Sequence, residues 1–439
     1  MICDPKLVEC ILVKDYNHFH DRATLWNSDK LLSKSLLDAK GSDWRLLRQN
    51  LLPIFSSGKL KGMFTQIFNC GDWITKRIKS VAVTGDSVEM ESLVFECVTE
   101  VIASCTFGVQ VLSDPNENKK FKAVYNHIYS YSPLKLIKHL NSLVHKHIFS
   151  IFRVSGIHKS VPGYFISLTK SIIEYRKLNK IKRPDFLQLM LDLKDEQEAD
   201  CMSNMKKRKE TCLFSNSATH VMNDSKEEKL LFNEERIASQ MFSFLFAGAS
   251  YTATTMSFAL FEIAKNDLIQ RRLQEEIEAS LMKQRGWNYL AIKNMIYLDQ
   301  VIQEVLRLHL FSPYTRLVTE PYTIPGTQIT LERGMLVFIP VSAIHRDPQY
   351  YPSPEQFNPD RFAGNNYKPS ATFLPFGHGP KICIAVKFAM LIVKVCLARI
   401  LSSYTIRLSE KMELPMCLDL EAPTPRIKGG LWLEFQKKK

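Results

Sequence analysis

The sequence predicts a mainly α-helical protein with small β-sheets, an α+β chain of 439 residues organised as a single domain. Two long apolar stretches favour helices, one over residues 237–265 and one from Val386 to Ser402, whereas strand-like runs are short and few. Hydrophobic residues make up 45% of the sequence, and no Gly/Ser-rich or Pro-rich linker divides it. One large helical core is therefore expected.

Charge and cysteine content restrict the partners and the compartment. The chain carries 58 Lys and Arg against 45 Asp and Glu, a net charge of +13, which suits an acidic protein partner or an anionic membrane surface. The basic residues are scattered and do not cluster with aromatic residues, which argues against nucleic acid. The ten cysteines show no repeated spacing and no C-x-x-C pair, a pattern typical of free thiols in a reducing compartment.

The first half of the chain predicts helices joined by polar segments. Residues 4–22 predict a short helix and a loop, and residues 23–41 a polar irregular segment. Several amphipathic helices are expected between 63 and 179. Residues 201–229 contain a run of four basic residues and several Ser and Asn residues, and they predict a polar surface loop.

The second half contains the clearest helix and strand signals. The apolar run 237–261 is long enough to span a bilayer, but its many Ser and Thr residues favour a buried helix. A helix is expected from about Tyr297, and strands between 322 and 339, ending in the apolar run 336–339. Residues 423–435 predict a hairpin that turns at Gly429 and Gly430.

The stretch 376–385, called the cysteine loop below, carries the strongest chemical signal. Gly377, Gly379 and Pro380 allow the backbone to wrap closely around a flat group. Cys383 lies where the loop becomes a helix, so backbone N–H groups and the helix dipole favour its thiolate. A single thiolate in such a loop suits haem iron. The alternative is a small buried hydrophobic residue.

The order Phe-x-x-Gly-x-basic-x-Cys-x-small, from Phe376 to Ala385, resembles the haem-thiolate loop of the cytochrome P-450 family. Three further motifs resemble that family: Trp44-x-x-x-Arg48, Glu304-x-x-Arg307 and Arg361 in its Asn-Pro-Asp-Arg-Phe context. The resemblance covers residues 4–435 and is closest to insect family-6 microsomal enzymes. Two positions depart from the family, because Lys381 replaces an arginine and Ala385 a glycine.

The resemblance implies a haem b cofactor and assigns roles to the matching residues. Cys383 would be the axial ligand of the iron. The residues implied to contact the haem and its propionates are Arg22, Trp44, Arg48, Arg316, Phe376 and Lys381. Glu304, Arg307 and Arg361 would lock the fold around the haem. The candidates for a hydrophobic substrate pocket are Phe242, Phe246, Ala249, Leu317 and Val318.

The central helix departs from the family at the positions implied to relay protons. The family has a small-Gly-x-acid-Thr pattern, and here the acid position holds Ser250 and the threonine position holds Tyr251. Thr252 follows one residue later, about 100° further around the helix, and could substitute only if the helix bulges. The catalytic candidates are therefore Ser250, Tyr251 and Thr252, and we expect Tyr251 to fill space beside the iron.

The implied activity is insertion of one oxygen atom of O2 into a lipophilic substrate, such as a xenobiotic, a steroid or a fatty acid. NADPH-cytochrome P-450 reductase would supply the electrons, with cytochrome b5 as a second partner. The implied location is the cytoplasmic face of the endoplasmic reticulum membrane. The family's membrane anchor, first helix and first two strands have no counterpart here, so we expect a truncated chain with an incomplete first sheet.

Two alternatives stay open. The first is a haem-thiolate isomerase or dehydratase that works without a reductase, suggested by Ser250 and Tyr251. The second is a truncated or decayed paralogue with little activity, suggested by Lys381, Ala385 and the missing strands.

Overall fold

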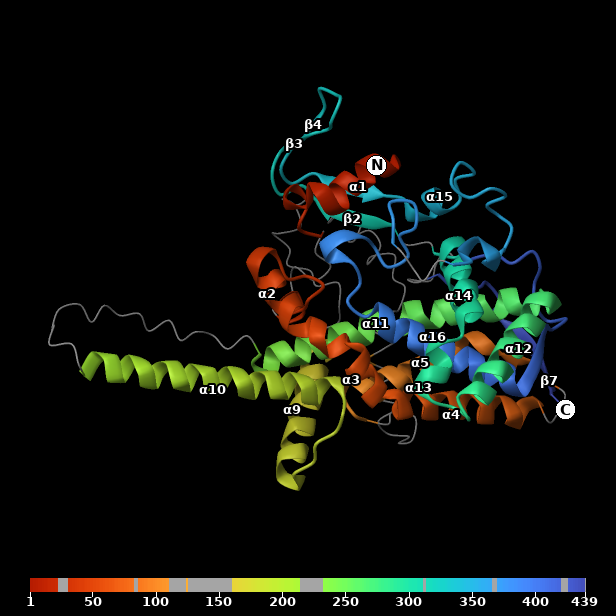
Figure 1. Cartoon of the computed structure of the whole chain (residues 1–439), viewed down its shortest axis with the longest axis horizontal. Helices are drawn as coiled ribbons and strands as arrows, with labels where there is room; N and C mark the ends of the chain where they lie inside the picture. Colours follow the sequence, from red (N-terminus) through yellow and green to blue (C-terminus); the bar gives the residue numbers. More distant parts are fainter. Residues whose placement is uncertain are drawn as a thin grey trace.

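The computed structural model describes residues 1–22, 31–82, 86–109, 124, 160–213, 232–310, 313–364, 369–419 and 425–438. Helices dominate and the sheets are small and antiparallel, as the sequence predicts. Long helices form the body of the molecule, and the N-terminal residues lie with strands β2–β4 at one end of it (Figure 1).

The helical body is built from nine longer helices. They are α2 (Gly41–Leu51), α4 (Phe64–Ala82), α5 (Met90–Thr106), α9 (Ser160–Asn179), α10 (Phe186–Leu213), α11 (Glu234–Ala264), α12 (Asp267–Lys283), α14 (Ile296–Leu308) and α16 (Val386–Ser403) within the described ranges. Shorter α-helices are α1 (Pro5–Glu9), α3 (Ser57–Gly62), α13 (Tyr289–Lys293) and α15 (Val341–His345). Two short elements matter for the site, the π-helix η1 (Cys10–Lys14) and the 3-10 turn η6 (Gly379–Lys381).

Helix α11 lies at the centre of the helical body. Its sequence favours a well-capped N-terminus and burial of most of its length. The Asn233 side chain caps its N-terminus by accepting a hydrogen bond from the Arg236 N–H at 2.8 Å, and two glutamates lie in its first turn. The helix packs against α5, α9, α14 and α16. Among the described helices only α11 is long and apolar enough to cross a membrane, and most of that stretch is buried inside the protein, as predicted.

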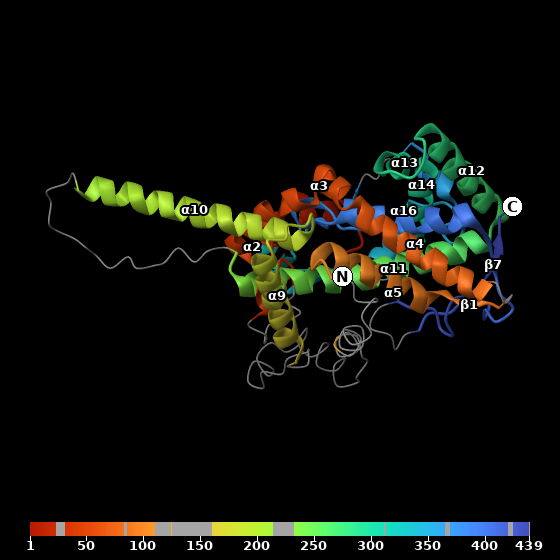
Figure 2. The same ribbon diagram turned by 90° about the horizontal axis from the view of Figure 1, so that it is seen from below.

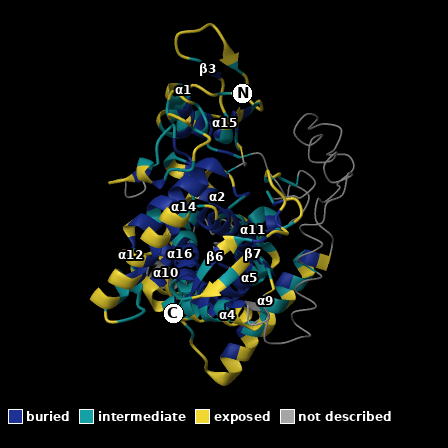
Figure 3. Cartoon of the chain, turned by 90° about the vertical axis from the view of Figure 1, so that its right-hand side faces the viewer, coloured by how far each residue is buried: buried dark blue, intermediate teal, exposed yellow. Residues whose placement is uncertain are grey.

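The buried side chains form two clusters. The larger one fills the helical body, where buried residues line α5, α11, α14 and α16 (Figure 3). The smaller one joins the N-terminal segment to strand β3 (Tyr322–Thr323), to strand β5 (Leu336–Ile339) and to α15. Its members are Val8, Ile11, Leu12, Phe19, Val318, Tyr322, Val337, Ile339, Val341, Ile344 and Leu374. This second cluster fixes the N-terminal segment beside the cysteine loop.

The described strands form three antiparallel sheets. Strand β2 (Tyr314–Leu317) pairs with β5 (Leu336–Ile339), and β3 (Tyr322–Thr323) pairs with β4 (Thr330–Leu331). Strand β7 (Trp432–Lys437) lies between β1 (Val88–Glu89) and β6 (Tyr404–Leu408). The predicted hairpin 423–435 is therefore wrong in its pairing, because the partners of β7 come from distant parts of the chain. The turn at Gly429 and Gly430 is present, and both have positive φ.

Helix α10 is longer than the sequence suggested. It continues through residue 213, so residues 201–213 of the predicted surface loop are helical, and residues 214–229 lie outside the described part. Both views show α10 projecting well beyond the helical body (Figures 1 and 2).

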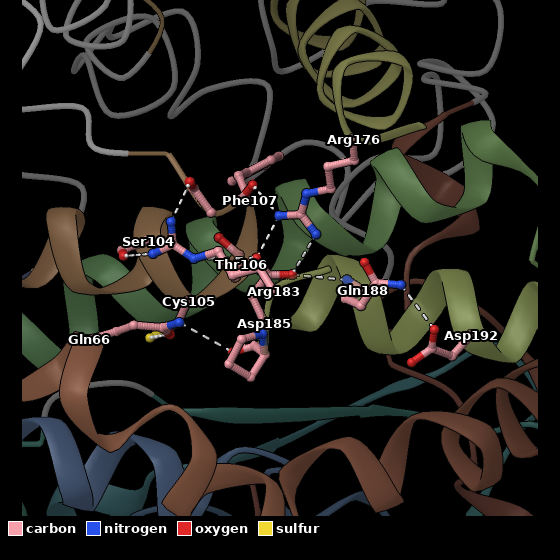
Figure 4. A network of polar contacts seen from close by, with 12 residues as sticks. Gln66, Ser104, Cys105, Thr106, Phe107, Arg176, Arg183, Asp185, Gln188 and Asp192 are labelled. Atoms are coloured by element: carbon pink, nitrogen blue, oxygen red, sulfur yellow. Dashed lines mark hydrogen bonds and ion pairs between the residues drawn. The ribbon is translucent and has the colours of Figure 1, made fainter. Parts of the chain in front are cut away.

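A buried polar network attaches the α9–α10 connection to the end of α5 (Figure 4). The Arg176 guanidinium donates to both carboxylate oxygens of Asp185, at 2.9 and 2.5 Å, and to the Phe107 carbonyl oxygen at 3.1 Å. Arg183 donates to the Gly108 carbonyl at 2.9 Å. Asp185 also accepts from the Gln188 N–H at 2.9 Å and so caps α10. Burial raises the pKa of Asp185, and Arg176 opposes that rise.

Replacing Asp185 by asparagine should destabilise the fold strongly. The variant leaves the buried Arg176 without an anionic partner, which typically costs about 3–5 kcal/mol. The matched control is Asp192→Asn on the same helix, where the carboxylate accepts one hydrogen bond from the Gln188 side chain. That change should cost about 1 kcal/mol or less. Urea unfolding of the two variants measures the difference, and equal losses would contradict the assigned role of Asp185.

Candidate functional site

The cysteine loop is held in a tight turn against the N-terminal segment. Gly377 and Gly379 have φ values of +80° and +71°. A Cβ atom on Gly379 would overlap the Leu12 carbonyl oxygen in η1, so this close approach requires glycine. The Cys383 N–H donates to the Phe376 carbonyl at 2.8 Å, and His378 Nε2 lies 2.9 Å from a Glu9 carboxylate oxygen. The loop is therefore fixed on both sides of the cysteine.

The Cys383 thiol lies between η6 and the start of α16. Its pKa is raised because the surrounding protein removes it from water. The Ala385 N–H, Arg22 and Arg48 act in the opposite direction but are weaker. A backbone N–H at the helix start favours the thiolate, as predicted, but in the protein without a ligand burial outweighs it. Coordination to a metal ion would supply the missing stabilisation of the thiolate.

Four cations surround this loop and are called the cation cluster: Arg22, Arg48, Arg316 and Lys381. Arg22 and Arg48 donate to the carbonyl oxygens of Lys381 and Ile382, at 2.9 and 2.7 Å. The Lys381 ammonium lies 3.7 Å from the centre of the Trp44 ring, and Arg48 lies 5.6 Å from the same ring. Segments far apart in the sequence thus converge on one site, as the motifs predicted.

Without a bound anion, the four cations of the cation cluster repel one another and lack a compensating negative charge. Burial, followed by repulsion from Arg22, lowers the pKa of Lys381 to about 6 and that of Arg316 to about 9. Within the described residues none of the four cations forms an ion pair with a carboxylate, and the buried Arg316 Nε lacks a hydrogen-bond partner. Asp21 is near enough to favour the Lys381 ammonium but lies 2.7 Å from His20. A bound anion would relieve this excess of positive charge.

A second charged network, in contrast, is built around a carboxylate of the protein itself. Glu304 and Arg307 are fully buried and form two hydrogen bonds, at 2.7 and 2.8 Å. Arg361 approaches the same carboxylate at 3.4 Å, and the Asn358 N–H donates to it at 2.9 Å. The structure therefore brings together the three residues that the sequence predicted to interact.

This network is connected to the cysteine loop through His345. Arg307 donates to the His345 carbonyl at 2.9 Å, and the Leu374 N–H donates to His345 Nε2 at 2.9 Å. Burial lowers the pKa of His345 to about 3, so the imidazole is neutral and can accept this hydrogen bond. The Tyr314 hydroxyl donates to the carbonyls of Leu374 and Pro375, at 2.7 and 3.0 Å. The Glu304 network thus supports the start of the loop.

Helix α11 presents one accessible face although it lies in the core. The accessible face consists of Ala247, Gly248, Tyr251, Thr254 and Thr255. Tyr251 is 43% exposed, whereas its neighbours Ser250 and Thr252 are buried, because adjacent residues lie about 100° apart around a helix. The helix is α-helical throughout, so no bulge brings Thr252 onto this face.

Aromatic contacts at the two ends of the accessible face show which other elements it lies beside. One end is covered at Phe244, whose ring lies 5.3 Å from Phe55, which in turn lies 6.5 Å from Phe388 in the first turn of α16. The other end is covered at Phe258, which stacks at 4.5 Å on His309 at the end of α14. The accessible face therefore lies between the start of α16, which follows the cysteine loop, and the end of α14, which leads to β2.

The five predicted pocket residues differ in burial, although the rings of Phe242 and Phe246 stack at 5.9 Å. Phe242, Ala249 and Val318 are buried core residues, and Phe242 packs on Phe165 at 5.2 Å. Phe246 and Leu317 are half-buried. Phe242, Ala249 and Val318 have almost no accessible surface in the protein without a ligand, and the assignment of a pocket to these five residues stays a prediction.

Three contributors to the site were not predicted: Tyr16, Tyr314 and His345. Tyr314 lies two residues before Arg316 on β2 and so shares its face, a signal that the sequence already contained. Tyr16 is close to Arg316 and Arg22, and burial raises its pKa to about 12. Neither Tyr16 nor His345 belongs to a pattern of spacing that would have identified it.

The residues fit a flat, anionic prosthetic group that carries its own metal. Cys383 provides one soft ligand, and the described part of the chain contains no group of three His, Cys, Asp or Glu side chains that could hold a metal ion by itself. The cation cluster can bind carboxylates. On α11 the accessible face carries the small side chain of Ala247, whereas Gly248 packs closely against Ile102 of α5, 2.8 Å from where a Cβ atom would lie. Haem combines these properties.

Comparison with known proteins gives consistent matches over the whole chain. The family model described as Cytochrome P450 matches residues 1–429. Probable cytochrome P450 6a14 of Drosophila melanogaster is 32% identical over 455 residues, covering 100% of this chain and 84% of the relative. Cytochrome P450 6k1 of Blattella germanica is 30% identical, with 100% and 82% covered. Cytochrome P450 6A1 of Musca domestica is 31% identical, with 99% and 82% covered.

The Glu304 network predicts a large loss of stability on replacement of Glu304 by glutamine. The buried Arg307 would lose its anionic partner, which typically costs about 3–5 kcal/mol. The control is Asp360→Asn, which breaks an exposed pair with Arg272 at 2.8 Å and should cost about 1 kcal/mol or less. Thermal unfolding compares the two, and a Glu304 variant as stable as the control would contradict this account.

Proposed function

This chain belongs to the cytochrome P450 family and is a haem-dependent monooxygenase, and on this premise we propose that it oxidises lipophilic substrates such as xenobiotics, steroids or fatty acids. The observation that best supports the proposal is the cation cluster around Cys383, which lacks carboxylate partners within the described residues. The two carboxylates of a haem would supply the missing negative charge.

The cofactor we propose is haem b, which when bound activates O2 for insertion of one oxygen atom into the substrate. Cys383 would be its protein ligand, held in position by the Phe376 carbonyl and by the Glu304 network through His345. The propionates would be bound by the cation cluster, which consists of Arg22, Arg48, Arg316 and Lys381. The Trp44 ring contacts the Lys381 ammonium, at 3.7 Å from the ring centre. A lysine can serve in place of an arginine here because three guanidinium groups lie close by.

The electron donor and the location follow from the family and from charge. We propose NADPH-cytochrome P450 reductase and cytochrome b5 as electron-donating partners, since acidic proteins suit a chain of net charge +13. We also propose the cytoplasmic face of the endoplasmic reticulum membrane as the location, where lipophilic substrates are concentrated.

The proposed proton relay on α11 uses hydroxyl groups and no carboxylate. Ser250 and Tyr251 stand at the two positions that the family uses for its proton relay. Of Ser250, Tyr251 and Thr252, only Tyr251 lies on the accessible face, because the other two are buried. The acid nearest to them on α11 towards its C-terminus, Glu262, lies 2.8 Å from His309 and 3.6 Å from Lys265. It is therefore engaged in other contacts at the end of the helix. Without a carboxylate on this part of α11, these hydroxyl groups would deliver protons slowly.

A reductase-independent isomerase or dehydratase is the second candidate function. The observation that favours it is the lack of a carboxylate on α11 between Arg236 and Glu262, because such reactions need no protons for reduction of O2. The two candidates differ in whether turnover requires NADPH. The coherent Glu304 network supports a functional site over a decayed paralogue.

One prediction of the proposed function concerns Cys383 as the protein ligand of the haem iron. The haem-loaded protein should give the thiolate-type Soret band when reduced under carbon monoxide, and Cys383→Ala should abolish that band. Cys417→Ala, which changes an exposed cysteine, is the control and should leave the spectrum unchanged. A wild-type spectrum from the Cys383 variant would show that another residue binds the iron.

The second prediction concerns the use of electrons. We expect most of the NADPH consumed to yield peroxide or superoxide instead of product, because α11 offers no carboxylate near the site. The double variant Ser250→Glu with Tyr251→Thr should increase product formed per NADPH several-fold, and Tyr251→Thr alone is its control. Parallel assays of NADPH, peroxide and product measure this ratio. Efficient coupling in the wild-type protein would contradict the prediction.

A further inference from the structure

The accessible face of α11 carries one large side chain among small ones. Between Phe244 and Phe258, whose rings are packed against other helices, this face holds only Ala247, Gly248, Tyr251, Thr254 and Thr255. Tyr251 is the most exposed of them, at 43%, so it is not a buried core residue. The shape of the space beside this face therefore depends on one residue.

The position of Tyr251 is fixed by the helix on which it lies. The Thr255 hydroxyl donates to the Tyr251 carbonyl at 2.8 Å, and the Thr254 hydroxyl donates to the Pro425 carbonyl at 3.2 Å. The ends of the face are anchored by the aromatic contacts of Phe244 and Phe258. Because α11 cannot shift or rotate without breaking these contacts, the phenol cannot be withdrawn by a movement of the helix.

We infer that Tyr251 is a specificity-determining residue, which admits slender ligands such as unbranched alkyl chains to the space beside Cys383 and excludes broad polycyclic ones. Of the substrate classes proposed above, this favours fatty acids and slender xenobiotics over steroids. The inference rests on the proposed function, because it takes the space between α11 and the cysteine loop as the site of haem and substrate. A tyrosine ring occupies volume that a small residue would leave free. A rigid, broad molecule needs that volume, whereas a straight chain can pass beside the ring.

The test uses two primary amines that bind haem iron and differ mainly in width, n-octylamine and 1-adamantylamine. Their dissociation constants are measured from the shift of the Soret band of the haem-loaded protein. The wild-type protein should bind n-octylamine at least about tenfold more tightly than 1-adamantylamine. In Tyr251→Thr this ratio should fall at least about fivefold, because the ring no longer occupies the space.

Two variants separate bulk from other effects. Tyr251→Phe keeps the ring and removes the hydroxyl, so the ratio should stay as in the wild-type protein. Tyr175→Thr makes the same chemical change at an exposed tyrosine on α9, outside the accessible face of α11, and should also leave the ratio unchanged. Should Tyr251→Thr bind haem poorly, Tyr251→Ala provides a second small residue at the same position.

The outcomes distinguish this inference from the proposed function. A wild-type protein that gives no thiolate-type spectrum with carbon monoxide would overturn the proposed function, and the inference with it. A normal spectrum with an unchanged ratio in both small variants would overturn the role of Tyr251 alone. A fall in the ratio that Tyr251→Phe reproduces would assign selectivity to the hydroxyl group and would overturn the argument from size.

Discussion

Excess positive charge around a single cysteine is the constraint on which this site depends. Arg316 and Lys381 are almost fully buried, and burial together with repulsion from Arg22 lowers the pKa of each. Backbone carbonyls of the cysteine loop accept hydrogen bonds from Arg22 and Arg48, which compensates only part of the lost hydration. An anionic cofactor would stabilise the folded state through these same residues, so cofactor binding and stability are coupled.

The Glu304 network and the cation cluster differ in ion pairing, and this difference suits them to different roles. Around Glu304 every charge has a partner of opposite sign, and the network connects to the loop through His345 and Leu374. It can therefore hold the loop before any ligand binds. The cation cluster has no carboxylate partner within the described residues, and this is what suits it to a carboxylate-bearing ligand. One network organises the backbone, and the other provides binding energy.

The sequence predicted the residues that belong to motifs and failed where only packing decides. Cys383, Glu304 and Arg307 lie as predicted, because their spacing and neighbours are specific. The pocket residues were harder, since α11 is apolar on nearly all sides and its hydrophobic pattern does not identify an outward face. The pairing of β7 was missed because its partners β1 and β6 come from distant segments, and local turn signals cannot reveal such contacts.

Because α11 is a regular α-helix, a shift of one position along the sequence changes which side chain lies on the accessible face. In an unbroken α-helix a shift of one position turns a side chain by about 100°, so Thr252 lies in the core while Tyr251 lies on the accessible face. Bringing Thr252 onto that face would require a bulge between Phe244 and Phe258. Those two residues are held by ring contacts to different parts of the fold, and a bulge would displace at least one of them. The packing at the ends of the face therefore determines which side chain reaches the site.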